Sequence, residues 1–289
     1  MIQYTDTLTR KAYAKINLGL DVIGRLENGY HQVRMIMQTV GIYDVLTFAP
    51  AESGIRISMD GGELPTGEDN LIYKAARLLM EAGGVKAGAD IHLEKHIPIA
   101  AGMAGGSSDA AATLLGLNEF LGLGFSPEQQ RHLGVRIGAD QPYCIMRGTA
   151  LAEGIGEVLT PLPPAPRCAL LVAKPDIQVS TKYVYEHLDA EKAWRHPDID
   201  GMCSAIENGE LAGVTSRLGN VLETVTIEAY PVIARLKQEM LSCGAMGSLM
   251  SGSGPTVFGI YDSQEQARAA YDCLEKAGLA RELFVTSFV

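Results

Sequence analysis

Two kinds of hydrophobic periodicity alternate along the chain and predict a protein of mixed α and β structure. In residues 12–22 every second side chain is apolar, which is typical of a strand with one buried face. Ile16 and Leu18 fall on that face, and Lys15 and Asn17 share the other. The pattern therefore predicts a half-buried strand. Its polar residues either face water or present two donors to a ligand.

Further segments show either the two-residue period of strands or the 3.6-residue period of helices. Strands are expected at 35–40, 44–48, 55–59, 90–98, 148–158, 169–173, 257–261 and 282–288, with another apolar strand directly after Asp140. Helices are expected at 71–80, 110–121, 180–188, 201–208, 227–241 and 264–277, with a further one opening at Ser126. Asn70 and Ser126 have the residue types that cap helix N-termini.

A glycine-rich stretch joins the predicted strand 90–98 to the apolar helix 110–121. Its residues are Pro98, Ile99, Ala100, Ala101, Gly102, Met103, Ala104, Gly105, Gly106, Ser107 and Ser108. Glycine and alanine leave the backbone N–H groups accessible, and the following helix adds the positive end of its dipole, so the stretch predicts a phosphate-binding loop. Ser107 and Ser108 are expected to cap the helix and to offer hydroxyls to a phosphate or a metal ion. A capped turn without a ligand is the alternative.

A second glycine cluster occupies residues 244–256 and ends in Gly252-Ser253-Gly254-Pro255. The glycines permit a tight backbone turn, which either packs against the first glycine-rich stretch or forms an ordinary hairpin between buried strands.

Two further positions are candidates for chemistry. Asp140 lies between a turn of small residues and a proline, where a carboxylate either serves the turn or acts as an acid or base at a cleft. The pair Asn28-Gly29 predicts a turn that presents Tyr30 and His31, which suits stacking on a planar ring. An ordinary hairpin with Tyr30 folded onto the sheet is the alternative.

Composition narrows the classes of function. The formal net charge of −10 argues against general nucleic-acid binding, and 47% hydrophobic residues are ample for packed cores. With no apolar run of about 20 residues and no signal peptide, the chain is expected in the cytoplasm, away from membranes. The five scattered cysteines, without a C-x-x-C pair, are expected to be reduced thiols.

Several common nucleotide and hydrolase motifs are missing from the sequence. It contains no G-x-x-x-x-G-K-[ST], no G-x-G-x-x-G and no G-x-S-x-G. A glycine-serine loop, a lysine and an aspartate at a turn remain. This combination fits phosphoryl transfer, in which catalysis consists mainly of positioning and charge stabilisation.

The stretch from Pro98 to Ala111 resembles the central ATP-binding motif of the GHMP kinases, which include galactokinase, homoserine kinase and mevalonate kinase. Met250-Ser251-Gly252-Ser253-Gly254-Pro255-Thr256 is similar to the third motif of that superfamily. Three further stretches resemble the branch that phosphorylates a methylerythritol carrying cytidine diphosphate. They are Ala14-Lys15-Ile16-Asn17-Leu18, Gly29-Tyr30-His31 and Gly138-Ala139-Asp140-Gln141-Pro142. Met103 and Gln141 depart from the residues commoner in the family.

The resemblance implies a role for each matching residue. Asp140 is expected to be the catalytic base, and Lys15 to act beside it. Asn17 is expected to bind the substrate and to orient the group on which these two residues act. Tyr30 and His31 are expected to hold the cytosine, and Tyr185 to close the stack, with Tyr183 as the second choice. Residues 98–108 are expected to bind the phosphates of ATP, and Ser108 to contact Mg²⁺.

The resemblance also implies an α+β fold with two domains and an active site in the cleft between them. Residues 1–155 are expected to form a ribosomal-S5-domain-2-like domain with the ATP loop, and residues 156–289 a ferredoxin-like domain. The expected reaction phosphorylates the C2 hydroxyl of the cytidine-diphosphate-bearing substrate, on the non-mevalonate route to isoprenoids, in a monomer or weak homodimer. The alternatives are another small-molecule kinase of the mevalonate or homoserine type and a non-catalytic nucleotide sensor.

Overall fold

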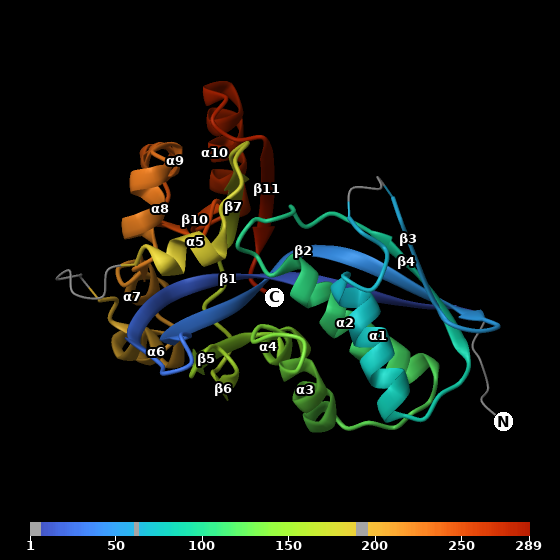
Figure 1. Cartoon of the computed structure of the whole chain (residues 1–289). Coiled ribbons are helices and arrows are strands. Elements are labelled where there is room, and N and C mark those ends of the chain that lie inside the picture. Colours follow the sequence, from blue (N-terminus) through green and yellow to red (C-terminus); the bar gives the residue numbers. More distant parts are fainter. Residues whose placement is uncertain (1–6, 61–63, 189–195) are drawn as a thin grey trace. The chain divides into compact units, whose positions relative to one another are not determined.

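The chain folds into two compact units that interleave along the sequence. The computed structural model describes residues 7–60, 64–188 and 196–289. The first unit contains the residues up to Ala14, Ile42–Ile99 and Ala104–Arg147. The second contains Lys15–Gly41, Ala100–Met103 and Gly148–Val289. Figure 1 shows the elements of each unit in sequence colours.

The first unit combines strands with a group of helices. Its part of the larger sheet has the order β3-β4-β2-β1, in which β4 pairs antiparallel with β2 and parallel with β3. Its strands are β3 (Ile55–Met59), β4 (Gly88–Glu94), the part of β1 (Leu8–Arg25) up to Ala14 and the part of β2 (His31–Ala51) from Ile42 onward, while the rest of β1 and β2 belongs to the second unit. The helices are α1 (Leu71–Ala82), α2 (Gly105–Phe120), α3 (Pro127–Val135) and α4 (Gln141–Met146). Most residues of α2 are buried, because α2 packs against α1, α3 and α4. That packing fixes the position of its N-terminal turn.

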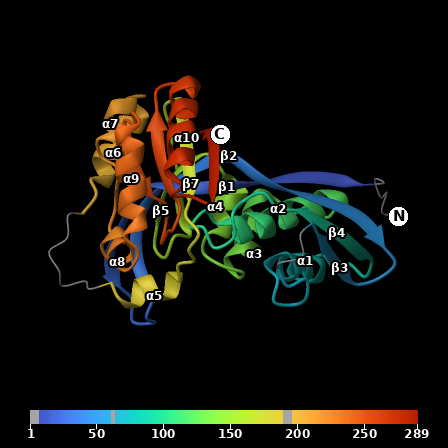
Figure 2. The same cartoon turned by 90° about the horizontal axis from the view of Figure 1, so that it is seen from above.

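The second unit contains the remaining strands, β5 (Thr149–Glu153), β6 (Val158–Pro161), β7 (Ala169–Lys174), β8 (Gly219–Asn220), β9 (Gly247–Met250), β10 (Val257–Tyr261) and β11 (Glu282–Ser287). Its helices are α5 (Thr181–Glu186), α6 (Ile199–Glu207), α7 (Leu211–Thr215), α8 (Glu223–Ala229), α9 (Val232–Ser242) and α10 (Gln264–Ala277). A four-stranded antiparallel sheet has the order β11-β7-β10-β9. Helices α9 and α10 pack on this sheet, as Figure 2 also shows.

The N-terminal strand differs from its prediction. Residues 14–22 of β1 are buried on both faces, so Lys15 and Asn17 do not face water. Part of this burial comes from a distant segment, since Gly19 pairs in parallel with Gly219 of β8. The two strands expected at 35–40 and 44–48 are one strand, β2. Periodicity within a short window cannot report either of these long-range effects.

Several helix predictions are confirmed and others are wrong. Helix α1 begins after Asn70, whose side chain accepts a hydrogen bond from the Ile72 N–H, and α3 begins with a capping box at Ser126. The strand expected after Asp140 is instead the short helix α4, whose first turn contains Pro142. The helix expected at 227–241 is two helices, α8 and α9, divided at Pro231, which cannot continue a helix ladder.

The expectation of five reduced cysteines is also wrong. Cys243 and Cys273 form a disulfide, because the C-terminus of α9 and the middle of α10 bring them together. Cys144, Cys168 and Cys203 take part in no disulfide among the described residues. Within the described ranges, no helix has the length and apolar character needed to cross a bilayer.

Candidate functional site

The glycine-rich loop enters α2 without a side-chain cap. The N-cap residue is Ala104, in the left-handed conformation with φ 56°, and no side chain accepts a hydrogen bond from the first turn. The N–H groups of Gly105, Gly106 and Ser107 precede the first i−4 hydrogen bond of the helix, which Ser108 N donates to Ala104 O at 2.8 Å. With no acidic residue in this turn, the helix end is suited to an anion.

The expectation that Ser107 and Ser108 cap this helix is wrong. Both lie inside the first turn, because the helix already begins at Gly105. The Ser108 hydroxyl donates to Tyr13 O at 2.6 Å and lies 3.4 Å from Cys144 Sγ. The serine therefore fixes the helix start to β1 in the first unit and leaves the N–H groups of the first turn uncapped.

The second glycine cluster packs against the first at Gly102. Ser251 Oγ donates to Gly102 O at 3.0 Å, and Met103 O accepts from Lys15 N at 3.1 Å. Gly102 has φ 70°, and a Cβ there would overlap the Ser251 carbonyl oxygen and lie 3.0 Å from that of Gly254. The same cluster connects the antiparallel strands β9 and β10, so both alternatives hold: it is a hairpin between buried strands, and it packs against the first glycine-rich stretch.

A buried ionic cluster fixes the residues that directly precede the glycine-rich loop. The Lys95 ammonium bridges the carboxylates of Asp44 and Asp109, with a distance of 2.8 Å to Asp109 Oδ2. Asp44 Oδ1 also accepts from the backbone N–H of His96 at 2.5 Å and of Ile97 at 2.7 Å. Burial raises the pKa of the Asp109 carboxyl to about 8, although Lys95 opposes the shift. The cluster joins β2, the end of β4 and the first turns of α2.

Lys15 and Asn17 lie together in the buried part of β1. Lys15 Nζ donates to Asn17 Oδ1 at 2.8 Å, and Asn17 Nδ2 lies 3.2 Å from Met35 Sδ. Lys15 is only 6% exposed, and within the described residues of its own unit no carboxylate lies within 4.0 Å of Nζ. A buried ammonium with one neutral acceptor is costly, so the pair is suited to a negatively charged ligand.

Asp140 precedes helix α4 without capping it. It occupies the N-cap position, but its backbone is already helical, with φ −79° and ψ −18°. Its side chain makes no capping hydrogen bond, while its carbonyl accepts from Cys144 N at 3.0 Å. Of the two alternatives for this residue, a local capping role is therefore wrong, and its partly exposed carboxylate remains available for chemistry.

The predicted aromatic turn forms between β1 and β2. The Asn28 side chain accepts from Tyr30 N at 3.1 Å, and the Tyr30 ring is 60% exposed and does not fold onto the sheet. The His31 ring lies 5.1 Å from that of Tyr185, whereas Tyr183 contacts His187 at 3.9 Å between ring centroids. Desolvation, with the charge of Arg25, lowers the pKa of His31. This arrangement supports Tyr185 over Tyr183 as the third ring.

Sequence reasoning missed three polar side-chain contacts in the second unit, two made by Arg34 and one by His196. Arg34 donates two hydrogen bonds to Asp200, at 2.9 and 2.6 Å, and one to Glu153 at 3.2 Å. The His196 imidazole lies 2.7 Å from Asp21 Oδ1. These partners are more than a hundred residues apart, so no local signal links them. The Arg34 contact occupies Glu153, which the sequence left unassigned as a metal ligand.

Comparison with family models gives two matches to this chain. The model of the GHMP kinases N terminal domain matches residues 70–148, and that of the GHMP kinases C terminal domain matches residues 202–280. The glycine-rich loop and Asp140 fall in the first match. The division between residues 155 and 156 lies between the two matches and stays a prediction.

Relatives of known name resemble the chain over nearly its whole length. The 4-diphosphocytidyl-2-C-methyl-D-erythritol kinase of Lachnoclostridium phytofermentans is 53% identical, over 98% of both chains. That of Lachnospira eligens is 54% identical, over 97% of this chain and 98% of its own.

Solved structures resemble the chain as well. A crystal structure of 4-(cytidine 5'-diphospho)-2C-methyl-D-erythritol kinase matches with a TM-score of 0.84 and 33% identity, over 97% of this chain and 99% of its own. Homoserine kinase from Cytophaga hutchinsonii shares the fold, with a TM-score of 0.78. It is 21% identical, over 98% of this chain and 94% of its own.

Proposed function

Because the chain belongs to the GHMP kinases and, within them, to the 4-diphosphocytidyl-2-C-methyl-D-erythritol kinases, we propose that it phosphorylates the C2 hydroxyl of that compound with ATP. The products are the 2-phosphate and ADP, on the non-mevalonate route to isoprenoids. The observation in the molecule that carries the proposal is the uncapped, glycine-rich start of α2.

The phosphates of ATP bind the glycine-rich loop, residues 98–108. Backbone N–H groups supply the donors, and the dipole of α2 adds a favourable field at its first turn. The hydrogen bond from Ser251 to the Gly102 carbonyl supports this assignment, because it fixes the loop backbone two residues before the N-cap of α2. A chain of net charge −10 thus binds a polyanion through local donors.

Asp140 and Lys15 carry the chemical step. The Asp140 carboxylate accepts the proton of the C2 hydroxyl while that oxygen forms its bond to the γ-phosphorus, and the bond to the bridging oxygen of ADP breaks. The Lys15 ammonium stabilises the charge that develops on the attacking oxygen. Asn17 binds the substrate beside Lys15, and the hydrogen bond from Lys15 Nζ to Asn17 Oδ1 supports their acting at one place.

The cytosine of the substrate binds at Tyr30, His31 and Tyr185. The exposed ring of Tyr30 offers a stacking face, and the neighbouring rings of His31 and Tyr185 offer a second aromatic surface. Its lowered pKa favours the neutral form of His31, in which one ring nitrogen accepts and the other donates a hydrogen bond to the base edge.

Mg²⁺ bound to ATP contacts Ser108. The serine is buried, and its hydroxyl directs its proton to Tyr13 O, so its oxygen would be the atom that holds the ion, in keeping with the oxygen ligands that Mg²⁺ prefers. The ion supplies neutralisation of phosphate charge. A cytoplasmic location and a monomeric or weakly dimeric state remain predictions from the sequence.

The experiment that tests the function is a substrate comparison. The purified chain, with Mg²⁺ and ATP, is incubated with 4-diphosphocytidyl-2-C-methyl-D-erythritol, mevalonate or homoserine. We expect ADP release and a new phosphomonoester signal by ³¹P NMR with the first compound alone. Turnover of mevalonate or homoserine without turnover of the cytidine compound contradicts the proposal, and ATP binding without any turnover indicates a nucleotide sensor.

A further inference from the structure

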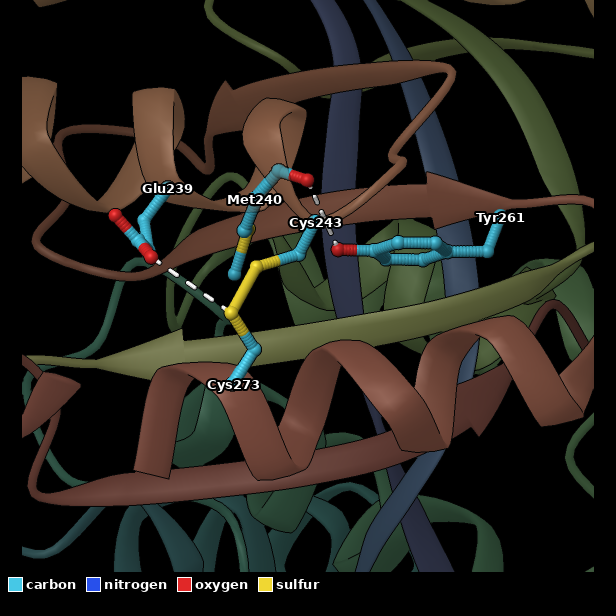
Figure 3. Close-up of a disulfide and its surroundings, with 5 residues drawn as sticks. All are labelled: Glu239, Met240, Cys243, Tyr261 and Cys273. Carbon is cyan, nitrogen blue, oxygen red and sulfur yellow. Dashed lines mark hydrogen bonds between the residues drawn. A yellow bond between two sulfur atoms is a disulfide. The ribbon is translucent and has the colours of Figure 1, made fainter. Parts of the chain in front are cut away.

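Three side chains with metal-binding atoms gather at the C-terminal end of α9, in a place that the proposed reaction does not use. They are Glu239, Cys243 and Cys273 (Figure 3). One carboxylate oxygen and the two sulfur atoms all lie within 4.8 Å of one another. Within the described parts of the chain, no other group of three such residues comes so close. All three residues are half-buried, so ions in solution can reach them.

The spacing of the residues explains why they meet. Glu239 and Cys243 are four residues apart, which places them on the same side of α9. Cys273 lies in α10, which packs against α9, and its sulfur atom is 3.7 Å from Glu239 Oε1. The Cα atoms of the two cysteines are 6.8 Å apart, a separation that a disulfide spans and that two thiolates on one metal ion also span.

The helix turn that carries two of these residues is held in place. Met240, between Glu239 and Cys243, is fully buried, and its carbonyl accepts a hydrogen bond from Tyr261 Oη at 3.3 Å (Figure 3). Tyr261 belongs to β10, so the end of α9 is attached to the sheet. The backbone that carries Glu239 and Cys243 is therefore fixed before any ion binds, as a metal site requires.

We propose that Glu239, Cys243 and Cys273 bind a thiophilic divalent cation, Zn²⁺ in particular, when the disulfide is reduced. A thiol reductant supplies two electrons and two protons, which cleave the sulfur–sulfur bond into two thiols. Binding of the ion releases those two protons and forms two metal–thiolate bonds and one metal–carboxylate bond. A water molecule completes four-coordination. Thiolate ligands favour Zn²⁺ over Mg²⁺, so this site is chemically separate from the ATP-bound metal.

The consequence is that α9 and α10 are joined in both redox states. The disulfide links them covalently when oxidised, and the ion links them when the thiols are free. Because the ion binds only the folded arrangement, it stabilises the reduced protein by mass action.

The test is a titration of the full-length chain with Co²⁺, a spectroscopic substitute for Zn²⁺. Reduced protein, freed of reductant under argon, should bind a single Co²⁺ with thiolate-to-metal charge-transfer absorption, and Zn²⁺ should abolish that absorption. The oxidised protein should give no such absorption. Zn²⁺ should raise the thermal midpoint of the reduced protein and leave that of the oxidised protein unchanged. Absence of charge-transfer absorption in the reduced protein overturns the proposal.

Variants assign the ligands. Cys243→Ser and Cys273→Ser should each lose the high-affinity site, and Glu239→Gln should weaken it by at least about tenfold, the lower limit for loss of an outer-shell partner. Cys203→Ser, which removes a half-buried thiol from α6, is the matched control and should bind Co²⁺ like the parent. Unchanged binding in either of the first two variants, or lost binding in the control, overturns the proposal. Unchanged binding in Glu239→Gln removes Glu239 from it. Circular dichroism establishes that each variant is folded.

Discussion

Lys15 has an environment that its sequence context does not reveal. Alternation in β1 places it on the polar face, and a polar face usually meets water, yet the side chain is 6% exposed. Its hydrogen-bond acceptor, Asn17 Oδ1, is neutral, and among the described residues of its own unit no carboxylate pairs with it. Burial of such a side chain against one neutral acceptor costs stability, which fits the role proposed for it toward a negatively charged ligand.

Replacing the proposed base tests the chemical step at a single atom. Asp140→Asn keeps the size of the side chain and removes the proton acceptor, so kcat should fall by about 10²- to 10⁴-fold. ATP affinity, measured by calorimetry, should stay within error, because Asp140 does not belong to the glycine-rich loop. Unchanged turnover in this variant would exclude Asp140 as the base.

The two neighbouring tyrosines of α5 form a matched pair for the cytosine. Tyr185→Ala removes the ring beside His31, and base stacking contributes about 1–3 kcal/mol, so KM for the cytidine substrate should rise about 5- to 150-fold. Tyr183→Ala removes a ring that contacts His187 instead and should leave KM nearly unchanged. Steady-state kinetics distinguishes them, and the reverse order would reassign the aromatic partner to Tyr183.

At this scale the sequence identified residue types better than residue environments. Tyr30 is exposed in the turn that Asn28-Gly29 predicts, because turn chemistry is local. The burial of Lys15 and the pairing of Arg34 with Asp200 depend on segments far away in the chain. Periodicity has no access to such contacts.

Among the elements, the loop before α2 depends on close backbone packing. Gly102→Ala adds a methyl group where the Ser251 carbonyl oxygen already lies, and it forces a non-glycine residue into a left-handed conformation. The conformation alone costs about 1–2 kcal/mol. Displacement of the loop should also raise KM for ATP.

Gly122→Ala provides the control for that variant. Gly122 has a similar φ of 61°, but a Cβ there has no neighbour within 4 Å. Gly122→Ala should lower the thermal midpoint less than Gly102→Ala does, and it should leave KM for ATP unchanged. Equal effects of the two variants on KM would show that loop packing at Gly102 does not position the phosphates.

The ionic cluster at the start of the loop makes a separate prediction about stability. Lys95→Met removes the cation shared by the buried side chains of Asp44 and Asp109, which leaves this acidic pair without its counter-charge. The free energy of unfolding in urea should decrease by about 3–5 kcal/mol. Arg56→Gln, which breaks an exposed ion pair with Asp90, should change it by at most about 1 kcal/mol. Similar losses in both variants would contradict a special role for the buried cluster.

Helix ends show what the sequence can and cannot predict at the element scale. Asn70 and Ser126 cap α1 and α3 as expected, since the capping side chain and the backbone N–H that donates to it are within three residues of each other. Ser107 and Ser108 failed as caps, because the helix begins earlier, at a left-handed alanine that no propensity favours. An unusual start of this kind is found where the backbone itself binds a ligand.

For the whole molecule, the order of the motifs along the sequence was enough to identify the family, but the sequence did not predict how the chain divides between the two units. The matched motifs run from Ala14 to Thr256 and identified the family, which the comparisons confirm. The interleaving of the two units was not predicted. It depends on pairings such as that of Gly19 with Gly219, which join segments two hundred residues apart.

The uncapped start of α2 also affects how fast the nucleotide arrives. A helix dipole acts only within its first turn, whereas the net charge of −10 acts over a Debye length, about 10 Å at 0.1 M salt. ATP therefore diffuses against a weak repulsion until it is almost bound. The association rate constant from stopped-flow fluorescence should rise as the salt concentration increases from about 0.01 to 0.1 M. A falling rate would reveal a positive surface that steers the nucleotide.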